Sequence, residues 1–173
     1  MRTIVKIIDL INEWLGRLLS PILALLAIVV LYDVAMRYIA GRPSDWAFYV
    51  ATGLFGAHFM LVAAYGLRHR VHIEVDVVKR LLSSRRQAVV EIAGYVLFFI
   101  PFAYLLLYFG WAFAERSISR LETTPGMADV PIWPVKLTIV IAGVLLVLQA
   151  VAIVLRAIQH LRGKPIPELE EED

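Results

Sequence analysis

The sequence predicts an all-α integral membrane protein with four transmembrane helices and with amphipathic interfacial helices at the N-terminus and between helices two and three. Two observations predict this class. Apolar residues make up 60% of the chain, charged residues only 18%, and the mean hydropathy is +0.74, far from the balance of a soluble domain. Four stretches are also long enough to cross a hydrocarbon core about 30 Å thick, which takes about 20 helical residues. We expect a single domain over residues 1–173.

The four apolar stretches predict spans at about 18–38, 46–67, 88–114 and 134–156. The second span carries no formal charge, and the first carries Asp33 and Arg37 near its far end. Pro101 is expected to kink the third span. Pro134 suits the first turn of the fourth, because a first-turn N–H has no partner within the helix.

The segment before the first span is amphipathic. Ile4, Ile8, Ile11 and Leu15 fall on one helical face, which predicts a helix lying along the membrane surface. An apolar run this long, with a long segment before it, argues against a cleaved signal peptide.

Two further segments lie outside the spans. Residues 71–87 place Val75, Val78 and Leu82 on one stripe beside several basic residues, which predicts a second interfacial helix in contact with lipid phosphates. Residues 165–173 are rich in proline and glutamate and predict a disordered tail.

Lysine and arginine predict the orientation. Twelve of them lie before the first span, between the second and third spans, or after the fourth, and five lie on the opposite side. Because short basic loops stay in the cytoplasm, both termini are expected inside. The expected location is the bacterial inner membrane. Trp46, Trp111 and Trp133 fall at the outer ends of their spans, where indole rings prefer the headgroup level.

Little in the sequence indicates chemistry. It contains no cysteine, no phosphate-binding glycine loop and no nucleophile motif, so we expect no catalytic residues, metal site or cofactor. A net charge of +2 does not indicate a nucleic-acid partner. Four short spans without inverted repeats do not indicate a complete secondary transporter.

His58 lies near the middle of the second span, where ionisable residues are functional candidates. The alternative is a neutral histidine bonded to a neighbouring helix. A bis-histidine haem would need a second imidazole at membrane depth, and His69, His72 and His160 all lie outside the predicted spans. Gln149 supplies the fourth span with a buried hydrogen-bonding group.

Several residues suit contact with a membrane partner. Arg37 lies near a membrane boundary, one turn after Asp33. Small residues on the second span permit close helix packing, and Glu115 ends the third span. The candidate partner interface is Arg37, Trp46, Gly53, Gly56, Ala57 and Glu115.

From the first span to about Leu161 the chain resembles the DctQ-like small membrane subunit of tripartite ATP-independent periplasmic (TRAP) transporters. The order and spacing of short motifs carry the resemblance. These are Arg37-Tyr38, Asp45-Trp46, Gly56-Ala57, His72-Ile73-Glu74-Val75-Asp76, Glu115, Ser119, Trp133-Pro134-Val135-Lys136 and Leu145-Leu146-Val147-Leu148-Gln149. One departure is that Ala47, Phe48 and Tyr49 follow Trp46, where many members carry acidic residues.

The resemblance implies a large permease subunit that carries the substrate and ion sites, and a periplasmic binding protein that delivers an organic acid or related solute. It implies that the small subunit scaffolds and anchors the large one, while an ion gradient drives uptake. Membrane lipids are the remaining expected partners. Two alternatives stay open at this point: a membrane redox subunit that anchors a haem, and an independent small channel or exporter working as a homo-oligomer.

Overall fold

The computed structural model describes residues 2–69, 82–125 and 129–162. Within these ranges the regular secondary structure is helical, apart from one isolated bridge between Thr123 and Pro131. The elements are α1 (Arg2–Tyr38), α2 (Ala47–Arg68), α4 (Ser84–Gly94), the π-helical turn η1 (Tyr95–Phe99), α5 (Ile100–Ser119) and α6 (Trp133–Leu161). Because α4, η1 and α5 form one continuous helix, the described residues contain four helices long and apolar enough to cross a membrane.

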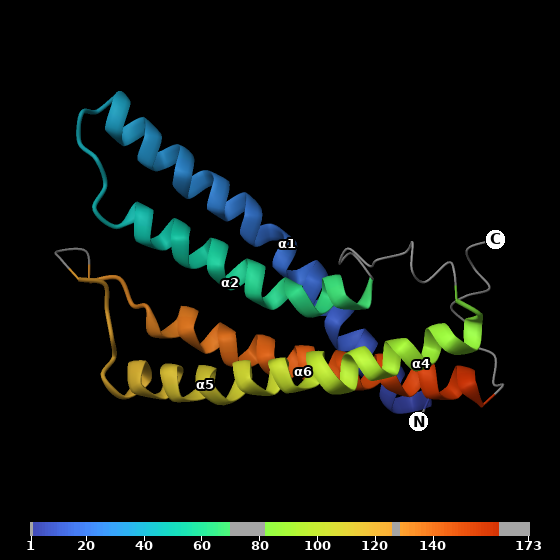
Figure 1. Ribbon diagram of the computed structural model, residues 1–173. Coiled ribbons are helices and arrows are strands. Elements are labelled where there is room, and N and C mark those ends of the chain that lie inside the picture. Colours follow the sequence, from blue (N-terminus) through green and yellow to red (C-terminus); the bar gives the residue numbers. More distant parts are fainter. Residues whose placement is uncertain (1, 70–81, 126–128, 163–173) are drawn as a thin grey trace.

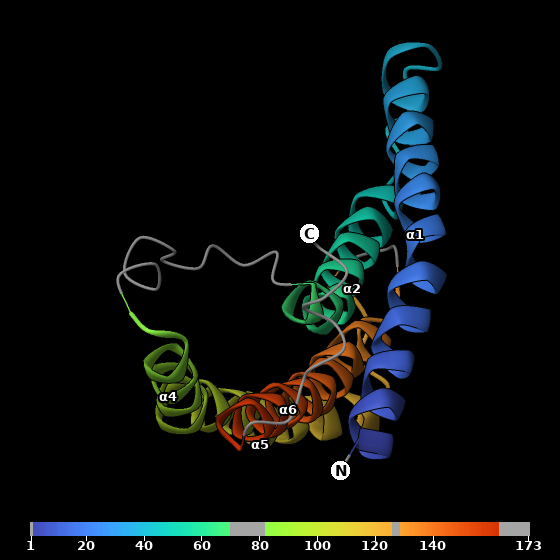
Figure 2. The same cartoon turned by 90° about the vertical axis from the view of Figure 1, so that its right-hand side faces the viewer.

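Two antiparallel pairs build the bundle (Figure 1). α1 pairs with α2, α5 pairs with α6, and α6 also packs on α2. The start of α1 and the end of α6 lie at one end of the bundle, here called the terminal end. The connection at residues 39–46 and the described parts of the connection between α5 and α6, residues 120–125 and 129–132, lie at the opposite end, here called the loop end. The view in Figure 2 shows α1 crossing beside α6 near the terminal end.

The core is built mainly on α6, the most buried helix. Its small residues let α5 approach α6 closely: a Cβ added at Gly143 would lie 3.2 Å from the Leu107 Cα. The residues of α6 that are buried are Val140, Ala142, Gly143, Leu145, Leu146, Gln149, Ala150, Ala152, Ile153 and Ala157.

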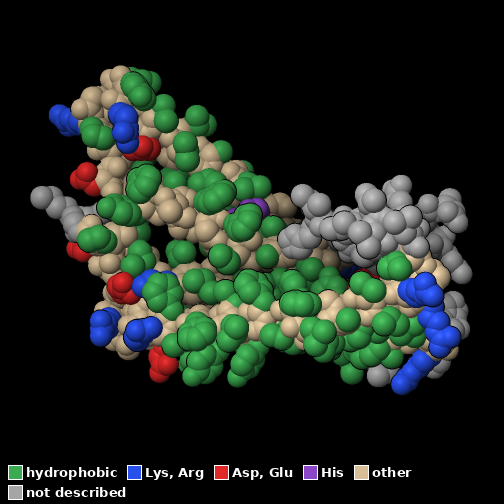
Figure 3. All heavy atoms as spheres, viewed as in Figure 1, with side chains coloured by type: hydrophobic (Ala, Val, Ile, Leu, Met, Phe, Trp, Pro, Cys, Tyr) green, Lys and Arg blue, Asp and Glu red, His purple; other side chains and the backbone are tan. Residues whose placement is uncertain are grey.

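The outer surface carries the remaining apolar side chains. Figure 3 shows them along the length of the helices, with charged side chains gathered at the two ends of the bundle. Large exposed apolar residues are numerous, among them Phe55, Phe59, Phe98 and Phe102. Their exposure to water would be unfavourable, but they suit contact with lipid tails or with a membrane partner.

The helices extend beyond the predicted spans, and α1 differs most. It runs without interruption through Pro21 from Arg2 to Tyr38, so the predicted N-terminal helix and the first span form one element. Its buried face also differs from the predicted stripe. Val5 and Ile8 pack against Ala152 of α6, whereas Ile4 and Ile11 are exposed.

The third span begins at Ser84 and continues through Pro101 to Ser119. Pro101 has no N–H for the carbonyl of Leu97, and the π turn of η1 lies directly before it. This turn brings Tyr95 and Phe99 against the core. Most of the predicted interfacial helix at 71–87 and the predicted tail at 165–173 lie outside the described residues.

Candidate functional site

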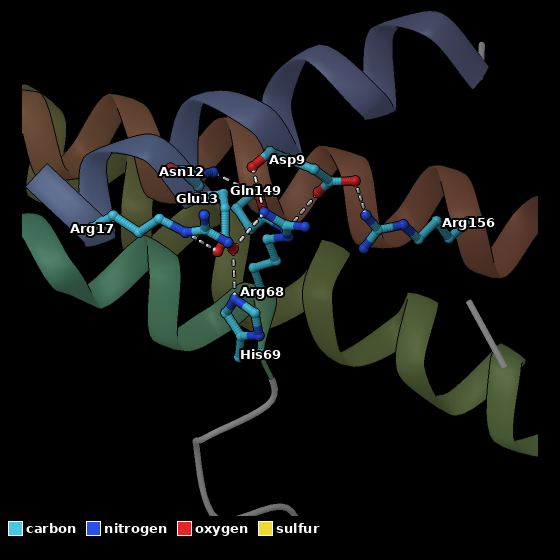
Figure 4. A network of polar contacts seen from close by, with 8 residues as sticks. All are labelled: Asp9, Asn12, Glu13, Arg17, Arg68, His69, Gln149 and Arg156. Atoms are coloured by element: carbon cyan, nitrogen blue, oxygen red, sulfur yellow. Dashed lines mark hydrogen bonds and ion pairs between the residues drawn. The ribbon is translucent and has the colours of Figure 1, made fainter. Parts of the chain in front are cut away.

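Polar side chains meet at the terminal end, where α1, α2 and α6 come together (Figure 4). On α1, Asp9 and Asn12 point at α6 and are almost fully buried. The Asn12 Nδ2 donates to Gln149 Oε1 at 2.6 Å, and the Gln149 Nε2 donates to Asp9 Oδ1 at 3.3 Å. The second oxygen of Asp9 is paired with Arg156. These four residues therefore join α1 to α6.

Glu13, one turn further along α1, joins the same helix to α2. Its Oε2 accepts from Arg68 and from His69, each at 2.9 Å, and its Oε1 accepts from Arg17 at 2.9 Å. Arg68 also donates to the backbone carbonyl of Asp9 at 2.6 Å. We call the eight residues of both halves the terminal-end network: Asp9, Asn12, Glu13, Arg17, Arg68, His69, Gln149 and Arg156.

The charged groups of the terminal-end network are paired with one another. Every carboxylate oxygen of Asp9 and Glu13 already accepts a hydrogen bond, and arginines from three helices surround them. The one buried atom of the network without a partner among the described residues is Asn12 Oδ1. Buried charges need such pairing to be tolerated, so this arrangement holds helices in place and leaves no carboxylate open to a transported cation.

At the loop end, the connection between α5 and α6 is closed by an ion pair. Lys136 donates to Glu122 at 2.6 Å and lies 4.1 Å from the centroid of the Phe113 ring. The hydrogen bond from Lys136 holds the pKa of the Glu122 carboxyl below its usual value. Because the lysine contacts residues of both flanking segments, it fixes how the chain enters α6.

Two of the predicted interface residues lie at the other connection of the loop end: Arg37 in the last turn of α1 just before it, and Trp46 at its end. Arg37 donates to Asp33 at 3.1 Å, as the spacing in the sequence indicated. The Trp46 ring stacks on Tyr32 with centroids 5.5 Å apart. Trp46 also lines an open hollow of about 380 Å³ together with Arg42 and Asp45. Neither of these two charged residues has an ion pair with another described residue.

The remaining four predicted interface residues lie on α2 and α5. Gly53 and Gly56 face α6: an added Cβ would lie 3.1 Å from the Val135 Cγ2 at Gly53 and 3.9 Å from the Val135 Cγ1 at Gly56. Ala57 is half-buried, and Glu115 is exposed on α5. These small residues therefore serve packing within the chain, and their contact with a partner stays a prediction.

His58 bonds to a neighbouring helix, one of the two roles considered for it. Its Nδ1 lies 3.2 Å from the carbonyl oxygen of Leu19 on α1. Among the described residues, no group of three or more His, Asp or Glu is placed to hold a metal ion.

The sequence analysis missed most of the terminal-end network and identified only Gln149. The missed signal is a second stripe on α1, where Val5, Ile8, Asp9, Asn12 and Gly16 recur at helical spacing and are all buried. The apolar stripe beside it conceals this pattern in the sequence.

Comparison with known families identifies one match. Residues 26–160 match the family described as tripartite ATP-independent periplasmic transporters, DctQ component. The match includes the residues of the terminal-end network that lie at the end of α2 and on α6, and it excludes the four on α1. Neither curated proteins nor solved structures give a significant match.

Proposed function

The chain belongs to the DctQ component family of TRAP transporters, and we propose that it is the small permease subunit that scaffolds and anchors the large permease subunit of one such transporter. In this proposal a periplasmic binding protein delivers an organic acid or related solute, and an ion gradient drives its uptake. The family match over most of the chain is the observation that carries the proposal.

The polar groups of the chain support a scaffold. An organic anion at membrane depth needs compensating donors or cations. The cations of the terminal-end network are already engaged by Asp9 and Glu13, and His58 is engaged by Leu19. The described residues thus offer no convergent set of open donors within the membrane, which is the reason for placing the substrate on the large subunit.

Co-purification tests the proposal. The tagged chain, expressed with the large permease subunit, should retain that subunit through solubilisation and size-exclusion chromatography. We propose Arg37, Trp46, Gly53, Gly56, Ala57 and Glu115 as the contact. Arg37→Ala, Trp46→Ala and Glu115→Ala test it best, because Gly53 and Gly56 also face Val135 in the same chain. Failure of the wild-type chain to retain the large subunit would reject the scaffold role.

We also propose that the chain lies in the bacterial inner membrane with the terminal end in the cytoplasm, on the basis of the distribution of basic residues. Reporter fusions test this orientation. A fusion at the carboxyl end should report the cytoplasm, and a fusion between Ser119 and Asp129 should report the periplasm. The reverse pattern would reject the orientation.

A further inference from the structure

His58 lies at the middle of the 22-residue helix α2 and therefore at the depth of the lipid tails. Its Nδ1 is 3.2 Å from the Leu19 carbonyl oxygen. Because a carbonyl only accepts hydrogen bonds, Nδ1 must carry the proton and donate it. In a neutral imidazole the other nitrogen, Nε2, is then a hydrogen-bond acceptor with an available lone pair.

This Nε2 has no hydrogen-bond partner among the residues that the structure describes. Nε2 is not one of the buried side-chain atoms that lack a partner. It is therefore accessible from outside the chain. Lipid tails contain no donors, and an unpaired polar group among them is unfavourable. A donor on a helix of another membrane protein would satisfy it.

We propose that Nε2 of His58 accepts a hydrogen bond from a donor side chain on a membrane helix of the large permease subunit. A hydroxyl, a primary amide or an indole N–H fits, because each is neutral and can be carried at membrane depth. The exposed rings of Phe55 and Phe59 on the same helix provide apolar surface nearby for that helix to cover. This inference rests on the proposed function and locates one polar contact within it.

Two substitutions separate the two nitrogens. His58→Asn keeps an amide near the position of Nδ1, so it preserves the bond to Leu19 but removes the acceptor. His58→Gln places its amide near the position of Nε2 and gives up the bond to Leu19. The experiment measures retention of the large subunit in a titrated pull-down, and the melting temperature of the small subunit alone in detergent.

The asparagine variant should bind the large subunit about three- to tenfold more weakly, the range given by one interhelical hydrogen bond, with a nearly unchanged melting temperature. The glutamine variant should bind more tightly than the asparagine variant and melt lower. Thr52→Val is the matched control, because the Thr52 hydroxyl is already bonded to the Phe48 carbonyl, and it should bind as the wild type does.

Equal binding by the wild-type and His58→Asn chains would overturn the inference while leaving the proposed function intact. A fall in the melting temperature of His58→Asn that accounts for its weaker binding would also overturn it, since the role of His58 would then lie within the chain. If the wild-type chain itself fails to bind, the proposed function fails first.

Discussion

At Gly16 of α1, the Tyr65 ring of α2 occupies the space that a side chain would need. A Cβ added there would lie 2.3 Å from the Tyr65 Cδ2 and 2.6 Å from its Cγ. These are atoms near the root of a ring, which cannot move without moving the whole side chain. Tyr65 also packs on His69, with ring centroids 4.3 Å apart, so a displaced Tyr65 disturbs the terminal-end network.

Gly16→Ala should therefore destabilise the chain by about 1–3 kcal/mol, the usual range for overpacking, measured as thermal unfolding in detergent. Gly66→Ala is the matched control on α2. An added Cβ meets nothing within 4 Å there, and alanine favours a helix by about 0.8–1.0 kcal/mol, so stability should stay the same or rise. Equal losses from both variants would contradict the close approach at Gly16.

The burial of Asp9 and Asn12 could not be predicted from the sequence. Each is a polar residue in an amphipathic segment, and a sequence does not show which distant side chains will meet such a residue. Their partners Gln149 and Arg156 lie more than 130 residues away. The hydrogen bond of His58 could be predicted as one of two alternatives, because every neighbouring helix offers backbone carbonyls.

The joint between α1 and α6 depends on the buried ion pair of Asp9 and Arg156, whose side chains are 8% and 17% exposed. Asp9→Ala should destabilise the chain by about 3–5 kcal/mol, because it leaves a cation in a partly buried site without this partner. The double variant Asp9→Ala, Arg156→Met should lose less stability than the sum of the losses of the two single variants.

The exposed pair on α1 provides the comparison for Asp9. Arg37 is half-exposed where it meets Asp33, and pairs of this kind contribute about 0.3–0.5 kcal/mol. Asp33→Ala should accordingly have a much smaller effect than Asp9→Ala in the same unfolding assay. Similar effects at the two positions would show that the terminal-end network does not hold α1 to α6.

The connection between α5 and α6 should respond to acid. Because the pKa of Glu122 is lowered in the folded chain, its ion pair with Lys136 adds stability above the ordinary glutamate pKa of about 4.3. That contribution is lost as the pH falls through the lowered value. Glu122→Gln should melt below the wild type at pH 7, and the difference should close at acid pH. A difference independent of pH would contradict the role of this ion pair.

The predicted spans and the observed helices differ mainly at their ends. Apolar runs located all four spans, because the hydrocarbon core sets their minimum length. They could not set the outer ends, since a helix outside the bilayer can continue on backbone hydrogen bonds alone. The start of α1 extends a predicted span in this way, because Arg2–Arg17 continues into the first span without a break. Ser84–Gln87 of α4 likewise precede the predicted third span.

The whole molecule combines an apolar exterior with polar groups that are used for internal contacts. α6 carries most of the core, the terminal-end network joins α1 to it and to α2, and Lys136 fixes its entry at the loop end. A chain of this kind can hold a larger partner in the bilayer without binding the solute itself. The family match makes the chain a DctQ component of a TRAP transporter, and that role is the one we propose for it.

Uptake by reconstituted vesicles tests this account most directly. The vesicles contain the large permease subunit and its binding protein, with wild-type, His58→Ala or Gln149→Ala small subunit, and the amount of assembled complex is quantified in parallel. Uptake per assembled complex, and its dependence on substrate concentration, should be the same for all three chains, because neither side chain contacts the solute. A variant that assembles normally but transports with an altered substrate range or affinity would contradict the scaffold role.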